Sequence, residues 1–160
     1  MRLTPCPMTG DDLRLALRAL ASPVVVVRAH GPAGSRGATI GSFTSVSLEP
    51  PQVAFFVMHG TRFSEVVAAA ERVDVHLLGA DQSDLATAYA YRAAPGEAEP
   101  PQPPVAGALG VLHGRVAARL ALADHTLVVV DVTDLTAGAD DAPLVWHRQG
   151  YRTVGEIAPP

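Results

Sequence analysis

The 160-residue chain contains no lysine and no asparagine, so each of its twelve cationic side chains is an arginine. Lysine supplies the amine of a pyridoxal Schiff base, the ammonium group of a Walker-type phosphate loop and the nucleophile of several covalent enzymes. The sequence therefore excludes these three chemistries.

Cysteine is also scarce, since Cys6 is the single one. Neither an internal disulfide nor a thiolate metal cluster can form, which fits a reducing compartment. No apolar run approaches the eighteen or so residues of a membrane span, and the first residues lack the apolar stretch of a signal peptide. We expect a soluble, cytoplasmic protein without membrane contact.

The net charge of −4 gives no electrostatic reason to bind nucleic acid, because such binding needs clustered cations that displace counterions. No G-x-G-x-x-G follows an expected strand, and no G-x-S-x-G is present. A Rossmann cofactor site and a serine hydrolase elbow are therefore not expected.

The length predicts a single domain over residues 1–160. Residues 1–8 and 155–160 are expected to be flexible tails, and the proline-rich residues 93–106 an extended loop. Apolar periodicity predicts helices over 13–20, 63–70 and 85–89, the first with a capping box at Thr9 and one face packed on a sheet.

Short β-branched or alternating runs predict strands, with residues 24–29 and 38–44 paired as a hairpin. In residues 109–122 the alternation places Leu112, Val116 and Leu120 on one side, and His113 and Arg119 on the other. Six or more short strands with few helices favour an antiparallel barrel with peripheral helices over a doubly wound parallel sheet. The other expected strands cover residues 52–58, 73–77 and 126–132.

Residues 38–58 concentrate hydroxyl groups among β-formers before a Pro-Pro pair. Strand-end hydroxyls and backbone N–H groups can hold a phosphate without lysine, because each donates a hydrogen bond to an anionic oxygen. The alternative is an edge strand decorated with serine and threonine for solubility. The hydroxyls are those of Ser42, Thr44, Ser45 and Ser47.

The order S-F-T-S-V-S-L-E-P-P in this segment, preceded by A-T-I-G and followed by V-A-F-F-V, resembles the first signature of the flavin reductase-like family. The resemblance continues through A-D-H-T-L-V-V-V and P-L-V-W-H-R-Q-G-Y-R and covers roughly residues 13–152. It implies an antiparallel split β-barrel that binds FMN, with FAD possible, and that uses NADH or NADPH as hydride donor.

The resemblance also implies site residues. His125, in a motif similar to G-D-H, is the implied catalytic residue at the edge of flavin and nicotinamide. Two segments are implied to wrap the ribityl phosphate, and three further side chains are implied to border the cofactor. These implied cofactor-binding residues are Thr39, Ser42, Thr44, Ser45, Ser47, Thr61, His76, Asp124 and Trp146.

The implied function is an NAD(P)H:flavin oxidoreductase that reduces flavin by hydride transfer and supplies it, by diffusion, to a flavin-dependent monooxygenase as transient partner. Gly41, Phe63 and Ala123 depart from the family pattern. They favour an alternative, a split-barrel protein without reductase activity that binds flavin or a small metabolite or catalyses a different reaction.

The spacing of His76, His113, His125 and His147 matches no short metal-ligand motif, so no metal site is expected. A homodimer is expected, because the apolar strands over residues 52–58 and 109–122 supply more apolar surface than one small core needs, and family members pair across one barrel face.

Overall fold

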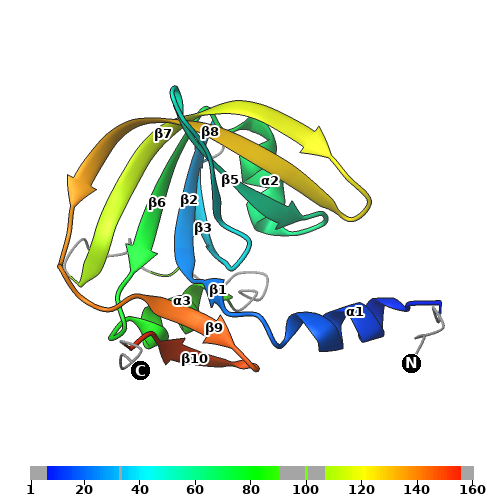
Figure 1. Ribbon diagram of the computed structural model, residues 1–160. Coiled ribbons are helices and arrows are strands. Elements are labelled where there is room, and N and C mark those ends of the chain that lie inside the picture. The colour runs from blue at the N-terminus through cyan, green and yellow to red at the C-terminus, as the bar shows by residue number, and fades with distance from the viewer. Residues whose placement is uncertain (1–6, 33, 91–99, 101–106, 156–160) are drawn as a thin grey trace.

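The computed structural model describes residues 7–32, 34–90, 100 and 107–155, which form ten strands and three short helices (Figure 1). All strand pairs are antiparallel, so the mainly β prediction is confirmed. The elements are α1 (Gly10–Leu17), β1 (Ser22–Pro23), β2 (Val25–Gly31), β3 (Gly34–Ile40), β4 (Thr44–Leu48), β5 (Pro51–Met58), α2 (Arg62–Ala69), β6 (Arg72–Leu78), α3 (Ser83–Ala90), β7 (Ala108–Ala121), β8 (His125–Ala137), β9 (Leu144–His147) and β10 (Gly150–Thr153).

Seven strands form one large sheet in the order β3-β2-β6-β7-β8-β5-β4, and β1, β9 and β10 form a small one. The two edge strands of the large sheet, β3 and β4, follow each other in the chain and are separated by residues 41–43 alone. So short a connection cannot span a flat sheet of seven strands, because neighbouring strands lie about 4.8 Å apart. The sheet must therefore curl until its edges approach each other, as Figure 1 shows.

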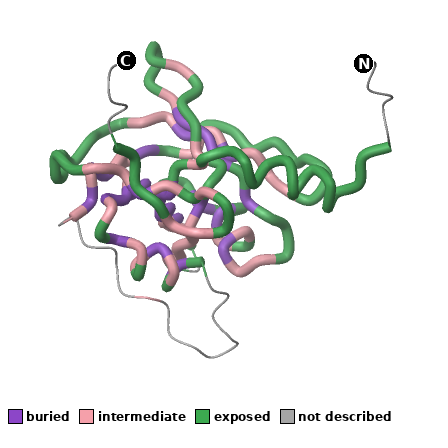
Figure 2. Tube along the Cα trace, turned by 60° about the horizontal axis from the view of Figure 1, so that its bottom comes forward, coloured by how far each residue is buried: buried purple, intermediate pink, exposed green. Residues whose placement is uncertain are grey.

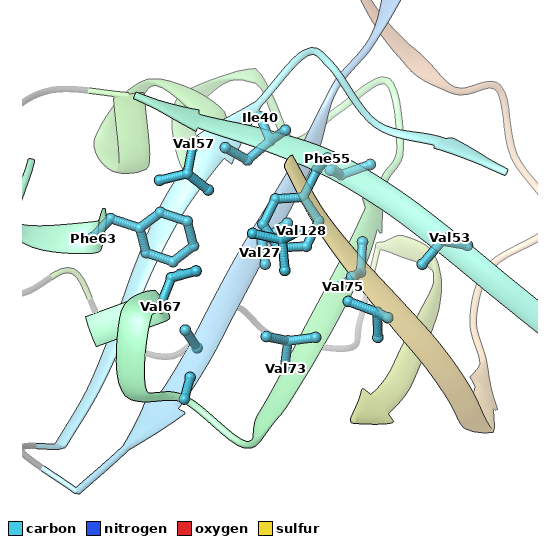
Figure 3. Close-up of a cluster of buried hydrophobic side chains, with 14 residues drawn as sticks. Val27, Ile40, Val53, Phe55, Val57, Phe63, Val67, Val73, Val75 and Val128 are labelled. Atoms are coloured by element: carbon cyan, nitrogen blue, oxygen red, sulfur yellow. The ribbon is translucent and has the colours of Figure 1, made fainter. Parts of the chain in front are cut away.

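The main core fills the inside of this curl. Val27 of β2, Phe55 of β5 and Val128 of β8 are each 0% exposed, and Figure 3 shows their side chains pointing toward one another. Helix α2 closes the core from one side with Phe63 and Val67. Phe63, which departs from the family pattern of hydroxyls, is thus a core residue that anchors α2.

A second core lies on the other face of β2 and β6, under α3. Leu78 and Val26 pack there with Ala86 and Tyr89 of α3. The ring of Tyr89 lies so close to Gly37 of β3 that a Cβ at position 37 would meet it at 2.4 Å. Both faces of this part of the sheet are therefore buried.

Strand β7 does not keep one apolar face, which corrects the alternation expected for residues 109–122. Two register shifts, at 113/114 and 116/118, mark bulges in its pairing with β8. A bulge inserts an extra residue and reverses which side chains face the core. Arg119 consequently turns to α2 and donates to the carbonyls of Val67 and Ala70, while Leu120 is exposed.

Helix α1 corrects another expectation. The capping box is present, because Thr9 Oγ1 accepts from Asp12 N and Asp12 accepts from Thr9 N. However, the helix buries none of its residues, and Figure 2 shows it exposed along its length. The periodicity of its leucines predicts the helix but not the surface that covers it.

The other expected elements are confirmed as α2, α3, β5, β6 and β8. The expected hairpin exists as β2–β3, but its second strand covers residues 34–40 and not 38–44, because the pairing with β2 ends at Ile40 and Thr44 begins β4, which pairs with β5. The expected tails at 1–8 and 155–160 and the loop at 93–106 lie largely outside the described residues. Of the helices that the structure describes, none combines the length and the apolar character needed to cross a membrane.

Candidate functional site

The end of β5 and the start of β8 bring the candidate catalytic residue next to the segment that leads into α2. Met58 is the register partner of His125, and His59 N donates to the carbonyl of Asp124 at 2.9 Å. The β7–β8 turn is therefore fixed to the β5–α2 connection. Residues from two distant parts of the sequence meet at this end of the sheet.

His125 is oriented by its neighbour. Its Nδ1 lies 2.8 Å from Oδ1 of Asp124, and because a carboxylate only accepts, Nδ1 carries the proton and donates. The hydrogen bond from His125 and the charge of its imidazolium hold the pKa of Asp124 below its ordinary value. With Nδ1 engaged, Nε2 is the nitrogen that can meet a ligand.

His59 is a residue that sequence reasoning did not assign. Its Nε2 lies 2.9 Å from Oγ1 of Thr126, the residue after His125. The signal in the sequence is a histidine directly after an apolar strand and before a glycine. In the structure this glycine, Gly60, has a φ of 70° and turns the chain toward α2. Two imidazoles thus lie on adjoining strand ends.

Thr61 begins the next element as the N-cap of α2. Its Oγ1 accepts from Ser64 N at 3.0 Å and donates to the carbonyl of Met58 at 3.1 Å. The N–H groups of Arg62 and Phe63 in the first turn have no intrahelical acceptor. The hydroxyl of Thr61 is therefore used within the protein, and the contribution of Thr61 to a site is to form the helix N-terminus, whose N–H groups can bind an anion.

The hydroxyl-bearing strand β4 runs along the edge of the sheet beside β5. Ser42, just before it, is fixed to β5, since its Oγ accepts from Phe56 N at 3.0 Å. Thr44 and Ser45 are exposed and pair with Ala54 and Val53. Ser47 follows a bulge, pairs with Gln52 and accepts from Glu49 N at 3.1 Å.

The predicted residues on β4 and β8 lie along β5 and do not form a cluster. Ser47 pairs with Gln52 and His125 pairs with Met58, six residues further along β5. At about 3.4 Å per residue these positions lie roughly 20 Å apart along the strand. A ligand that touches both must be elongated and lie along the β4–β5 edge.

Two predicted cofactor-binding residues lie under α3. Thr39 donates from Oγ1 to the carbonyl of Ala86 at 2.6 Å. His76 is 2% exposed, and neither of its ring nitrogens has a partner among the described residues. The pKa of His76 lies below its ordinary value, mainly because of burial. The charge of Asp74 opposes this effect, and the charges of Arg28 and His113 add to it.

Trp146 lies on the small sheet. It is 41% exposed in β9, and its ring meets that of Tyr151 edge-on with centroids 5.0 Å apart. It lines a hollow against α1, on a different sheet from His125.

No group of three or more His, Cys, Asp or Glu side chains in the described part of the chain could hold a metal ion. The four histidines that could be considered as ligands lie on β6, β7, β8 and β9. The donors along β4, at the start of α2 and at His125 are instead hydroxyls, backbone N–H groups, one guanidinium and imidazoles. This set suits an elongated ligand with an anionic end and a polar ring system.

The sequence is similar to those of known proteins over most of its length. The family described as "Flavin reductase like domain" matches residues 17–155. An NADH:FMN oxidoreductase of Rhodococcus qingshengii is 35% identical over 92% of this chain and 85% of its own length. The reductase component of 4-hydroxyphenylacetate 3-monooxygenase of Thermus thermophilus is 37% identical over 89% of this chain and 95% of its own.

Among solved structures, the styrene monooxygenase flavin reductase of Pseudomonas putida S12 aligns with a TM-score of 0.80 and 27% identity. The alignment covers 91% of this chain and 99% of that one. The match to the family spans most of the chain and includes both β4–β5 and the His125 turn. The chain therefore belongs to the flavin reductase-like family.

Proposed function

We propose that the protein is an NADH-dependent flavin reductase that uses FMN and supplies reduced flavin to a partner monooxygenase. The similarity to an NADH:FMN oxidoreductase and to a monooxygenase reductase component, each over most of both chains, supports this assignment. The observation in the structure that carries it is the oriented imidazole of His125 at the open end of the β4–β5 edge.

His125 acts at the reacting end of the site. Because Asp124 accepts from Nδ1, the ring is held in one orientation and Nε2 points to a ligand as hydrogen-bond partner. The dinucleotide supplies the hydride and the flavin accepts it, so the chain contributes orientation and polarity. His125 binds and orients these two groups and stabilises charge at the flavin edge.

The β4–β5 edge acts as the flavin-binding strip. Ser45 has an exposed hydroxyl without a recorded partner among the described residues, and Ser47 uses its oxygen only as an acceptor, so both can still donate. Arg62 and the first turn of α2 offer a second anion-binding point. Gly41 and Ala123, which depart from the family pattern, are exposed and Phe63 is buried, and none of the three offers a side-chain donor, so the proposed strip relies on the hydroxyls of β4 and on the start of α2.

The protein is also proposed to be a homodimer. Phe56 and Leu120 flank Leu127 across β5, β8 and β7, and their side chains are 36% and 57% exposed. Met58 and Leu122 extend the same patch with 47% and 44% exposure. A contiguous apolar sheet face of this kind is typical of an obligate interface, which buries roughly 2,000 Å² or more.

The proposed location is the cytoplasm, where NADH is available. Release of reduced flavin to a monooxygenase requires only a transient encounter between the two proteins.

The test of the proposed function is NADH oxidation at 340 nm with and without FMN, together with an FMN titration of the purified protein. NADH oxidation that depends on added FMN is expected. Flavin binding without oxidation of NADH or NADPH would instead assign the chain a binding role.

A further inference from the structure

A cavity of about 360 Å³ lies between α1 and the turn of the β9–β10 hairpin, away from the β4–β5 edge. Arg14 and Arg18 line it from the helix, and Trp146 and Arg148 line it from the hairpin. Its volume falls in the range of small-molecule sites, roughly 300 to 1,000 Å³. Figure 1 shows the C-terminal end of α1 near the tip of this hairpin, with the helix leading away from it toward the N-terminus.

The cavity concentrates positive charge in a chain whose net charge is −4. Three of the twelve arginines line it, and no acidic side chain does. Arg14 pairs with the exposed Asp11 at 3.3 Å. Arg18 and Arg148 have no ion pair with any residue that the structure describes. Two guanidinium groups are therefore available for an anion, with bidentate geometry suited to phosphate.

The aromatic wall of the cavity is Trp146. Its partner Tyr151 contacts it at 71° between ring planes, which holds the indole in place by an edge contact. An indole that is 41% exposed beside guanidinium groups offers a stacking surface for a planar ring.

The turn that carries Arg148 is strained. His147 pairs with Gly150, so Arg148 and Gln149 form a two-residue loop, and both have positive φ, 49° and 61°. Such a type I′ turn favours Asn-Gly, whereas arginine and glutamine resist this conformation. Backbone strain of this kind concentrates at binding sites, and the side chains of both strained residues line the cavity.

We propose that this cavity binds the adenosine diphosphate end of a dinucleotide, with the diphosphate on Arg18 and Arg148 and the purine on Trp146. The inference rests on the proposed function, because NADH and FAD both carry this group. It adds a second recognition point, separate from the His125 surface, that distinguishes dinucleotides from FMN.

Trp146 is the only tryptophan of the chain, so its fluorescence reports on the cavity directly. Titration with ADP, which has neither nicotinamide nor isoalloxazine, is expected to change the emission saturably with a Kd of about 1 mM or below. Adenosine and inorganic phosphate are each expected to bind more weakly. A linear, unsaturated response to ADP overturns the proposal.

Arg148→Gly removes the guanidinium and relieves the positive-φ strain, so ADP binding should weaken about tenfold while the melting temperature stays equal or rises. Arg18→Ala, at the exposed C-cap of α1, should weaken ADP binding to a similar degree. Arg72→Ala changes an exposed arginine on β6 and serves as the matched control. Equal weakening in all three variants overturns a specific site.

Steady-state kinetics identify the dinucleotide. If the cavity holds NADH, Arg148→Gly raises the KM for NADH whether FMN or FAD is the acceptor; if it holds FAD, only the KM for FAD rises. Unchanged KM values for NADH and FAD contradict the proposal. A protein that binds ADP through Trp146 but oxidises no NADH would retain this site and lose the proposed reductase function, so the two failures are distinguishable.

Discussion

Nδ1 of His113 on β7 lies 2.7 Å from Oδ1 of Asp74, its register partner on β6. The other oxygen of Asp74 accepts from Nε2 of His30 on β2 at 2.8 Å. Ser35 on β3 and Thr136 on β8 bond the outer nitrogens of the two rings at 2.7 and 2.8 Å. One carboxylate thus joins side chains from five consecutive strands of the large sheet.

Asp74→Ala is expected to destabilise the sheet by about 2 kcal/mol, because both imidazoles lose a charge-assisted hydrogen bond in a half-buried position. A fall in melting temperature of roughly 4 to 8 °C would accompany this loss. Asp11→Ala removes a carboxylate from an exposed pair and should change stability little. Equal effects of the two substitutions would contradict the proposed role of Asp74.

The same network predicts a pH dependence. Burial alone would raise the pKa of Asp74, but hydrogen bonds and charges of His113 and His30 outweigh it and hold the pKa below its ordinary value of 3.8. A carboxylate with a depressed folded-state pKa contributes stability above its unfolded pKa and loses it as pH falls through the folded value. The difference in the free energy of unfolding between wild type and Asp74→Ala should therefore shrink progressively as the pH falls below 3.8, as measured by denaturant unfolding.

His76 is expected to reduce stability, because it is buried and both ring nitrogens lack a partner among the described residues. His76→Leu should stabilise the fold by about 1 kcal/mol and raise the melting temperature by roughly 2 to 4 °C. Since burial lowers the pKa of His76 below 6.5, wild type loses stability as pH falls below 6.5, and the variant should lose less. A lower melting temperature for His76→Leu would indicate a polar partner such as a bound water.

Leu120→Asp should convert the proposed dimer to a monomer, because it places a charge within the apolar patch, directly beside Leu127. Leu135→Asp is the matched control, since Leu135 is equally exposed, at 58%, but near the other end of β8. Light scattering at micromolar concentration measures both. A dimer that survives Leu120→Asp would place the interface elsewhere.

The strands were predictable because their signals are local. The β-branched run of residues 24–27 and the Pro-Pro pair at the start of β5 determine strand positions through steric contacts between neighbouring residues. The faces were less predictable, because the bulge between Val116 and Ala118 reverses the sides of Arg119 and Leu120. Helix α3 also buries the face that His76 occupies. Long-range contacts decide both.

In the candidate site, too, local features could be predicted from the sequence and long-range contacts could not. Asp124 and His125 are sequence neighbours, so their hydrogen bond follows from the motif. The pairing of His125 with Met58 brings together residues 67 positions apart and could not be read from spacing. The convergence of Arg18 and Arg148 on one cavity depends on the docking of the small sheet near α1.

Replacing Ser45 and Ser47 together by alanine should lower FMN affinity at least tenfold, because each lost charge-assisted hydrogen bond costs about 1.5 to 3 kcal/mol. Both residues are on the edge strand β4, so the fold should tolerate the change. Thr153→Ala, an exposed hydroxyl on β10, is the control. Unchanged FMN titration in the folded double variant would place the phosphate at the start of α2.

His125→Ala tests the reductase assignment most directly. Nε2 is free to meet a ligand because Nδ1 donates to Asp124, so the imidazole orients the hydride donor or stabilises the reduced flavin. NADH oxidation should slow by roughly 10- to 1000-fold, about 1.4 to 4 kcal/mol in barrier, with little change in FMN affinity. The loss should appear in turnover or in the KM for NADH.

His59→Ala is the matched control for His125→Ala, because it removes a second imidazole from the adjoining strand end and breaks the contact with Thr126. A merely structural role of His125 predicts that melting temperature and FMN affinity fall together, since the substitution removes the hydrogen bond to Asp124 at the start of β8. Melting temperature, FMN affinity and steady-state oxidation measured on one preparation separate the two roles. Full activity in His125→Ala would remove this residue from the reacting end and leave His59 as the remaining imidazole there.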